Sequence, residues 1–121
     1  MRRLLTVPDS VDRPIAVATA ELFKALAHPA RVQVLEALAG SEYPVGELAD
    51  RLNMELSHLS QQLAVLRRAG LVNNRRVGSV VFYRLRDPRT MQLLFVAQEL
   101  LVTSLQGNQE LLQRLGGPSK T

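Results

Sequence analysis

The stretch LSHLSQQLAVLRRAGLVNNRRVGSVVFYRLRDP, residues 56–88, is the most informative part of this chain. Its first half carries apolar residues at the spacing of one helix face: Leu59, Leu63 and Leu66. After Gly70 the pattern changes to two short strands, 72–76 and 80–85, joined by a turn over 77–79. The sequence therefore predicts a helix followed directly by a β-hairpin.

Positive charge is concentrated in the same part of the chain. Residues 67–89 contain seven arginines against one acid, Asp87, and so carry a net charge of +6, whereas the whole chain carries only +4. A local basic patch of this kind is typical of a surface that faces a polyanion. A helix followed by a basic hairpin is the outline of a winged helix-turn-helix, in which the helix enters the major groove and the hairpin contacts the DNA backbone.

The rest of the chain is expected to be mainly helical. Residues 1–13 show no clear period and are interpreted as a flexible arm, and residues 116–121 as a disordered tail. Between them we expect one DNA-binding and dimerisation domain, 14–115. The helices ahead of the hairpin are expected over about 14–27, 29–40, 45–53 and 56–69, with an extended link at 41–44. The buried positions expected in the first helix are Ile15, Leu22, Phe23 and Leu26.

A last helix should begin at Asp87 and Pro88, which suit an N-cap and a first helical position. Gly107 either kinks this helix or separates it from a final turn. The predicted fold class is mainly α with a small β-hairpin wing, a winged helix-turn-helix in the order α-α-α-α-β-β-α. Apolar residues nearly encircle the last helix, so some of its faces should meet a second subunit.

Composition narrows the classes of function. At 121 residues the chain fits one domain, and its 4% aromatic content favours duplex DNA over unpaired bases, which stack on aromatic side chains. The absence of Cys excludes disulfides and thiolate metal sites. No apolar run is long enough to span a bilayer, and residues 1–14 lack a signal-peptide pattern, so we expect a cytosolic protein without a membrane partner.

Four segments carry a resemblance to a known family. ELFKALAHPARVQVLEAL, VGELADRLN, SHLSQQLAVLRRAGLV and RRVGSVVFYRL closely resemble the ArsR/SmtB family of bacterial transcription regulators, over about residues 21–87. The resemblance implies a winged-helix homodimer that binds operator DNA, usually as a repressor that an inducer releases. It also implies a dimer interface built from the first and last helices.

The resemblance assigns candidate site residues by position. On the recognition helix the implied DNA contacts are Ser57, Ser60 and Gln61, with His58 and Gln62 beside them. At the helix end and on the wing they are Arg67, Arg68, Arg75, Arg76, Gly78 and Ser79. The implied dimer interface comprises Leu22, Met91, Leu94, Phe95, Leu101 and Leu105. Gln can pair bidentately with adenine, and Arg meets phosphate or a narrow minor groove. Glu55 departs from the family, which usually has a capping Ser there.

The family's usual metal ligands are missing from this chain. Pro44 and Gly46 occupy the positions of a CxC pair, and the last helix contains no His. Zinc and nickel normally require imidazole or thiolate at convergent positions. We therefore predict no family-type metal site and no cofactor; the alternative is an unusual site built from His28, carboxylates or the amino terminus. The residues do not identify an effector.

Two classes of function remain after this reading. The first is a sequence-specific double-stranded DNA-binding transcription regulator, a homodimeric repressor on an inverted-repeat operator. The alternative is a non-enzymatic interaction module that uses the C-terminal helix to bind a partner. An enzyme is not expected, because no nucleophile–base constellation, phosphate loop or paired carboxylate motif is present.

Overall fold

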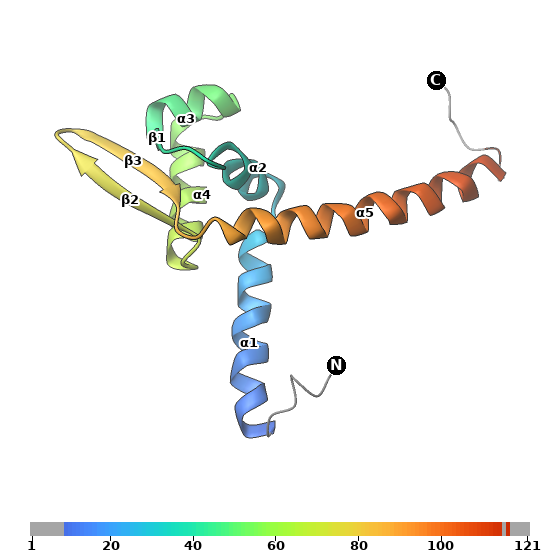
Figure 1. The fold of residues 1–121 in the computed structure, drawn as a ribbon. Helices are drawn as coiled ribbons and strands as arrows, with labels where there is room; N and C mark the ends of the chain where they lie inside the picture. The colour runs from blue at the N-terminus through green and yellow to red at the C-terminus, as the bar shows by residue number, and fades with distance from the viewer. Residues whose placement is uncertain (1–8, 115, 117–121) are drawn as a thin grey trace. The chain divides into compact units, whose positions relative to one another are not determined.

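The computed structural model describes residues 9–114 and 116 (Figure 1). Its elements are α1 (Asp9–Leu26), α2 (Pro29–Ala37), β1 (Tyr43–Pro44), α3 (Val45–Leu52), α4 (Leu56–Arg68), β2 (Val72–Val77), β3 (Val80–Leu85) and α5 (Arg89–Arg114). The elements from α1 to β3 belong to one compact unit, which ends at Asp87, and α5 belongs to a second. The predicted fold class, a mainly α winged helix-turn-helix, is confirmed.

Helix boundaries follow local chemistry. The side chain of His28 caps α2, because its Nδ1 accepts a hydrogen bond from the backbone N–H of Ala30 at 3.1 Å. Asn53 ends α3 in the left-handed conformation, with φ of 52°. Gly70 follows α4 with φ of 80°, a conformation that costs glycine little, and turns the chain into β2.

Two helices differ from the expectation. Helix α1 begins at Asp9 rather than near Pro14, so residues 9–13 of the expected arm are helical; residues 1–8 lie outside the described part. Pro14 removes one backbone donor, but its fixed φ is that of a helix, and α1 runs through it. Helix α5 also runs without interruption through Gly107. Of the expected tail, residues 117–121 lie outside the described part.

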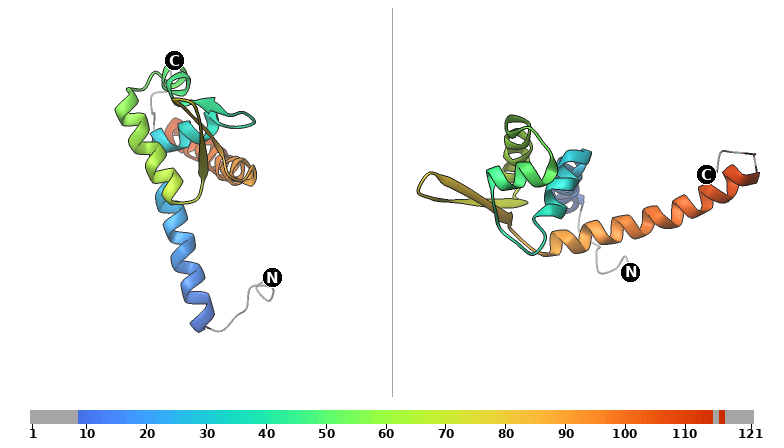
Figure 2. Two further views of the ribbon diagram at one scale, coloured as in Figure 1. Left: turned by 90° about the vertical axis from the view of Figure 1, so that its left-hand side faces the viewer. Right: turned by 90° about the horizontal axis from the view of Figure 1, so that it is seen from above.

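The sheet contains a strand that the sequence did not reveal. The expected link at 41–44 contributes β1, and the three strands pair antiparallel in the order β1-β3-β2. Val77 pairs with Val80, so the hairpin turn consists of two residues, Gly78 and Ser79, rather than three. Gly78 has φ of 61°, as two-residue hairpin turns with glycine first require. The hairpin projects away from the α2–α4 helices of its unit (Figure 2).

The core of the first unit lies between α2, α3, α4 and the base of β2. Its largest fully buried side chains are Val34, Leu35, Leu38, Leu48, Leu59, Leu63, Leu66 and Val72. Each buried leucine contributes roughly 1.5–3 kcal/mol relative to an exposed one. The predicted apolar face of α4 is therefore confirmed as its buried face, and it fixes which side chains of α4 point outward.

Large apolar side chains remain exposed outside that core. On α1, Ile15 and Phe23 are more than half exposed, although the sequence pattern predicted them as buried. On α5 the exposed large apolar residues are Phe95, Val96, Leu100, Leu101, Val102 and Leu105. None of the helices in residues 9–114 is both long and apolar enough to cross a membrane.

Candidate nucleic-acid interface

Helix α4 presents a polar face opposite its buried one. Ser57, Ser60 and Gln61 are exposed, and their spacing of three and four residues places them on one side of the helix. His58 is half-buried at the edge of this face. Hydroxyl and amide groups in this arrangement supply donors and acceptors that can pair with base edges in a major groove. We refer to Ser57, Ser60 and Gln61 as the reading face.

Gln62 does not belong to the reading face, and its expected place there requires correction. Its side chain is only 7% exposed, on the same side of α4 as Leu59, Leu63 and Leu66. Its Oε1 accepts a hydrogen bond from Nη1 of Arg31 at 3.1 Å. In this structure Gln62 is therefore engaged in a contact inside the protein and lies outside the reading face.

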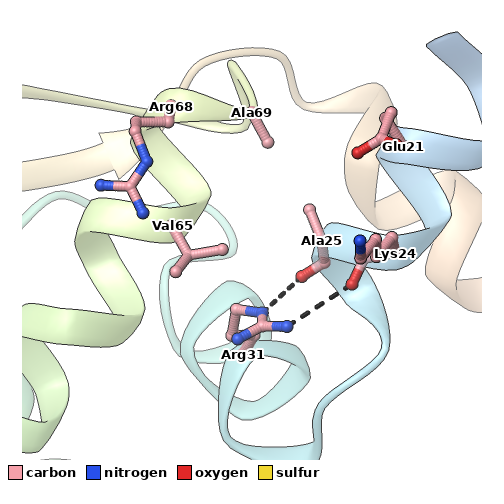
Figure 3. A pocket seen from close by; sticks show the side chains of 7 residues that line it. All are labelled: Glu21, Lys24, Ala25, Arg31, Val65, Arg68 and Ala69. Atoms are coloured by element: carbon pink, nitrogen blue, oxygen red, sulfur yellow. Dashed lines mark hydrogen bonds between the residues drawn. The ribbon is translucent and has the colours of Figure 1, made fainter.

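Arg31 connects three helices through this contact. Besides Gln62 of α4, its guanidinium binds the last turn of α1: Nε donates to the carbonyl of Ala25 at 2.6 Å, and Nη2 donates to that of Lys24 at 3.4 Å (Figure 3). The carbonyls at the C-terminal end of a helix lack partners in the helix and carry partial negative charge. Arg31, from α2, thus satisfies the end of α1 and holds α4 beside it.

An open cavity of about 400 Å³ lies beside Arg31, between α1, α2 and α4 (Figure 3). Its lining residues are Glu21, Lys24, Ala25, Arg31, Val65, Arg68 and Ala69. Both α1 and α4 end at this cavity, and cations near helix C-termini are electrostatically favourable. The C-terminal ends of α1 and α4 therefore explain why Lys24, Arg31 and Arg68 gather at this cavity.

The wing carries arginines of two kinds. Arg75 forms a two-pronged ion pair with Glu42 at 2.8 Å, and its guanidinium lies 4.8 Å from the centre of the Phe82 ring. The hydrogen bond from Arg75 holds the pKa of the Glu42 carboxyl below its ordinary value. The other arginines of the helix end and wing are exposed, as are Gly78 and Ser79 at the tip: Arg67, Arg68, Arg76, Arg84 and Arg86.

The N-terminal end of α4 lacks a side-chain cap. Glu55 occupies the N-cap position with φ of −61° and ψ of 140°, and its carboxylate makes no capping hydrogen bond. The first backbone N–H groups of a helix are unsatisfied without such a bond. The departure at Glu55 therefore leaves the start of the recognition helix without a capping bond and with a negative charge near the reading face.

We expect Glu55→Ser to stabilise the protein by about 1 kcal/mol, because serine accepts a hydrogen bond from the first turn. The same change removes a negative charge that opposes phosphate, so duplex affinity should also rise several-fold. Urea unfolding and a duplex titration measure the two effects. Glu55→Gln is the control, since it removes the charge without supplying a good cap. Equal stability of the Ser and Gln variants would contradict the capping argument.

Metal-ligating side chains do not gather in the described part of the chain. Within residues 9–114, no three His, Cys, Asp or Glu side chains lie close enough to hold an ion together. His28 already serves as the cap of α2.

Comparison with known sequences identifies the family. Residues 28–74 match the family described as bacterial regulatory protein, arsR family. The uncharacterised HTH-type transcriptional regulator Rv0081 of Mycobacterium tuberculosis is 44% identical over 109 residues, which cover 88% of this chain and 96% of that protein. The biofilm growth-associated repressor of Agrobacterium fabrum is 46% identical over 79 residues, which cover 65% of this chain and 68% of that protein.

Solved structures agree with this result. The crystal structure of Mycobacterium tuberculosis Rv0081 has a TM-score of 0.71 at 45% identity and covers 78% of this chain and 96% of its own. The solution structure of the homodimeric winged helix-turn-helix DNA-binding domain Mb0332 from Mycobacterium bovis has a TM-score of 0.70 at 28% identity. The match covers 84% of this chain and 93% of that domain. With a relative matched along almost its whole length at 44% identity, this chain belongs to the ArsR family of bacterial transcription regulators.

Proposed function

We propose that this regulator acts as a homodimeric repressor that binds an inverted-repeat operator in double-stranded DNA. The observation that carries the proposal is the exposed reading face of α4, which belongs to the same unit as the exposed arginines at the end of α4 and on the wing. Relatives named as repressors support the direction of regulation. A dimer seated on promoter DNA would repress by excluding the polymerase from its site.

In the proposed complex each recognition helix enters a major groove. Gln61 pairs with a base edge, and Ser57 and Ser60 contact base edges or phosphates. Arg67 and Arg68 at the end of α4 reach the backbone, and the wing, with Gly78 and Ser79 at its tip, lies along it. These contacts make affinity steeply dependent on salt, because each neutralised phosphate releases counterions.

The proposed dimer uses the exposed apolar side chains of α1 and α5. Phe95, Leu101 and Leu105 are each more than half exposed. A protein that acts as a single subunit seldom leaves a row of large apolar side chains exposed to water. Leu94 is buried, and Leu22 and Met91 are half-buried. These three expected interface residues therefore expose less apolar surface to a second subunit than the sequence analysis anticipated. The homodimeric solution structure of Mb0332 supports a two-fold assembly here.

Selection of duplexes from a random pool by the purified protein tests this function. A two-fold related sequence should emerge, with half-sites centred about one helical turn, roughly 10 base pairs, apart. Transcription from a promoter that carries the selected site should fall when the protein is added. A pool without enriched sequence would contradict the proposal and favour the interaction module, in which α5 binds a partner protein.

We expect Gln61→Ala to lower operator affinity about tenfold or more and to relax the preference at one base pair of each half-site. A bidentate amide–base pair contributes roughly 1–3 kcal/mol of discrimination. Binding to operators with all four bases at that position, measured by fluorescence anisotropy, gives both effects. The matched control is Gln33→Ala, an exposed glutamine on α2. An unchanged base preference would remove Gln61 from the reading role.

A further inference from the structure

Arg75 is the wing arginine that already has a partner within the protein. Its Nε and Nη2 each donate to one carboxylate oxygen of Glu42, both at 2.8 Å. A two-pronged pair of this kind is shorter, stronger and more directional than a single charged contact. The guanidinium also lies over the Phe82 ring, 4.8 Å from its centre, in a cation–π contact.

The strand register shows what this pair connects. Arg75 of β2 is opposite Phe82 of β3, and Phe82 is opposite Pro44 of β1, so the three residues form one row across the sheet. Glu42 directly precedes β1. The side chain of Arg75 therefore crosses over β3 and holds the far edge of the sheet. Since β1 is only two residues long, this pair reinforces a short edge that joins the wing to α3.

Arg76 differs from Arg75 in the face of the sheet from which its side chain projects and in its contacts. Successive side chains of a strand point to opposite faces, so Arg76 projects from the face opposite to Arg75. Its side chain is exposed and has no hydrogen bond or ion pair with any other residue that the structure describes. Its charge is available to DNA, whereas that of Arg75 is balanced by Glu42.

The energetics of phosphate binding separate the two arginines further. A phosphate that bound Arg75 would have to displace a carboxylate held by two short hydrogen bonds, and it would offer only a similar charge in return. Glu42 stays ionised at neutral pH, since its hydrogen bond from Arg75 lowers its pKa, and Arg84 adds to this effect. An intact pair carries no net charge and so adds little to counterion release.

We propose that Arg75 is a positioning residue that fixes the wing through Glu42 and Phe82, and that Arg76 supplies the phosphate contact on this strand. The inference rests on the proposed DNA-binding function. It also assigns a role to Glu42: its carboxylate keeps Arg75 away from DNA and thereby limits the number of phosphates that the wing neutralises.

The test is the salt dependence of duplex binding by the full chain. In the proposed dimer Arg76→Ala removes one phosphate contact from each subunit. The plot of log affinity against log salt concentration should therefore be less steep by about 1.8, which is about 0.9 for each of the two contacts. The double variant Arg75→Ala/Glu42→Ala removes the pair without changing net charge. It should bind several-fold more weakly at every salt concentration, with the slope of the wild type. Glu42→Gln should instead steepen the slope by about 1.8, because it frees Arg75 in both subunits of the proposed dimer.

The outcomes are distinct. A slope for Arg75→Ala/Glu42→Ala that falls as much as that of Arg76→Ala would mean that Arg75 binds phosphate and would overturn the inference. Unchanged affinity and unchanged slope in the double variant would exclude a positioning role. Faster amide exchange in residues 72–77 and 80–85 of the free double variant would support it, since loss of a phosphate contact alone would not loosen the hairpin. Wild-type protein without steep salt dependence would instead contradict the proposed function itself.

Discussion

Replacing Leu101 with glutamate is expected to leave the protein monomeric and to weaken operator binding at least about 100-fold. Leu101 is 56% exposed on α5, beside other exposed apolar residues that the proposed dimer covers. A carboxylate buried in such an interface without a partner costs several kcal/mol. The monomer then loses the second half-site, which in a dimer binds at high effective concentration.

Sedimentation equilibrium and fluorescence anisotropy measure the two consequences of Leu101→Glu. Gln92→Glu is the matched control, because it places the same charge at an exposed polar position of α5. The control should remain dimeric and bind DNA with little change. A Leu101→Glu variant that stays dimeric would move the interface away from this part of α5.

The second large effect is expected at Arg31. Arg31→Met keeps a side chain of similar length but removes every donor, so Gln62 Oε1 and the carbonyl of Ala25 lose their hydrogen bonds. Buried or partly buried acceptors without donors cost about 1–3 kcal/mol each. We expect the free energy of unfolding to fall by about 2–4 kcal/mol, which urea unfolding measures directly.

A second substitution separates this explanation from a general packing defect. Gln62→Leu in the Arg31→Met background removes the unsatisfied amide and extends the apolar face of α4. When both partners of a buried hydrogen bond become apolar, the net cost is small. The double variant should therefore recover part of the lost stability. No recovery would show that the Arg31–Gln62 contact does not cause the loss.

The winged helix was predictable from local patterns in the sequence. The spacing of Leu59, Leu63 and Leu66 located the buried face of α4, and Gly70 marked its end. The strand predicted over residues 80–85 has the same bounds as β3 in the structure. These features depend on residues a few positions apart, which is why pattern analysis finds them.

Gln62 was misplaced although the signal was present. Residues 59, 62, 63 and 66 follow the spacing i, i+3, i+4, i+7, which places Gln62 on the leucine face of α4. A glutamine there needs a buried partner, and Arg31 supplies it. The family position suggested a DNA contact, but helix geometry alone argues for the interior.

Other contacts had no local signal. Arg75 and Glu42 are 33 residues apart, and Arg31 and Gln62 are 31 apart, so only the fold brings each pair together. Strand β1 is two residues long, too short for alternation to be visible. The start of α1 at Asp9 was hidden by Pro14, which usually indicates a boundary.

The central claim is that two copies of one surface, α4 with its wing, bind adjacent half-sites of a single duplex. Hydroxyl-radical footprinting on a selected operator tests this most directly. The account predicts protected backbone segments in two-fold related blocks about one helical turn apart, with protection lost in Leu101→Glu. A single protected block, or protection that persists when the protein is monomeric, would contradict it.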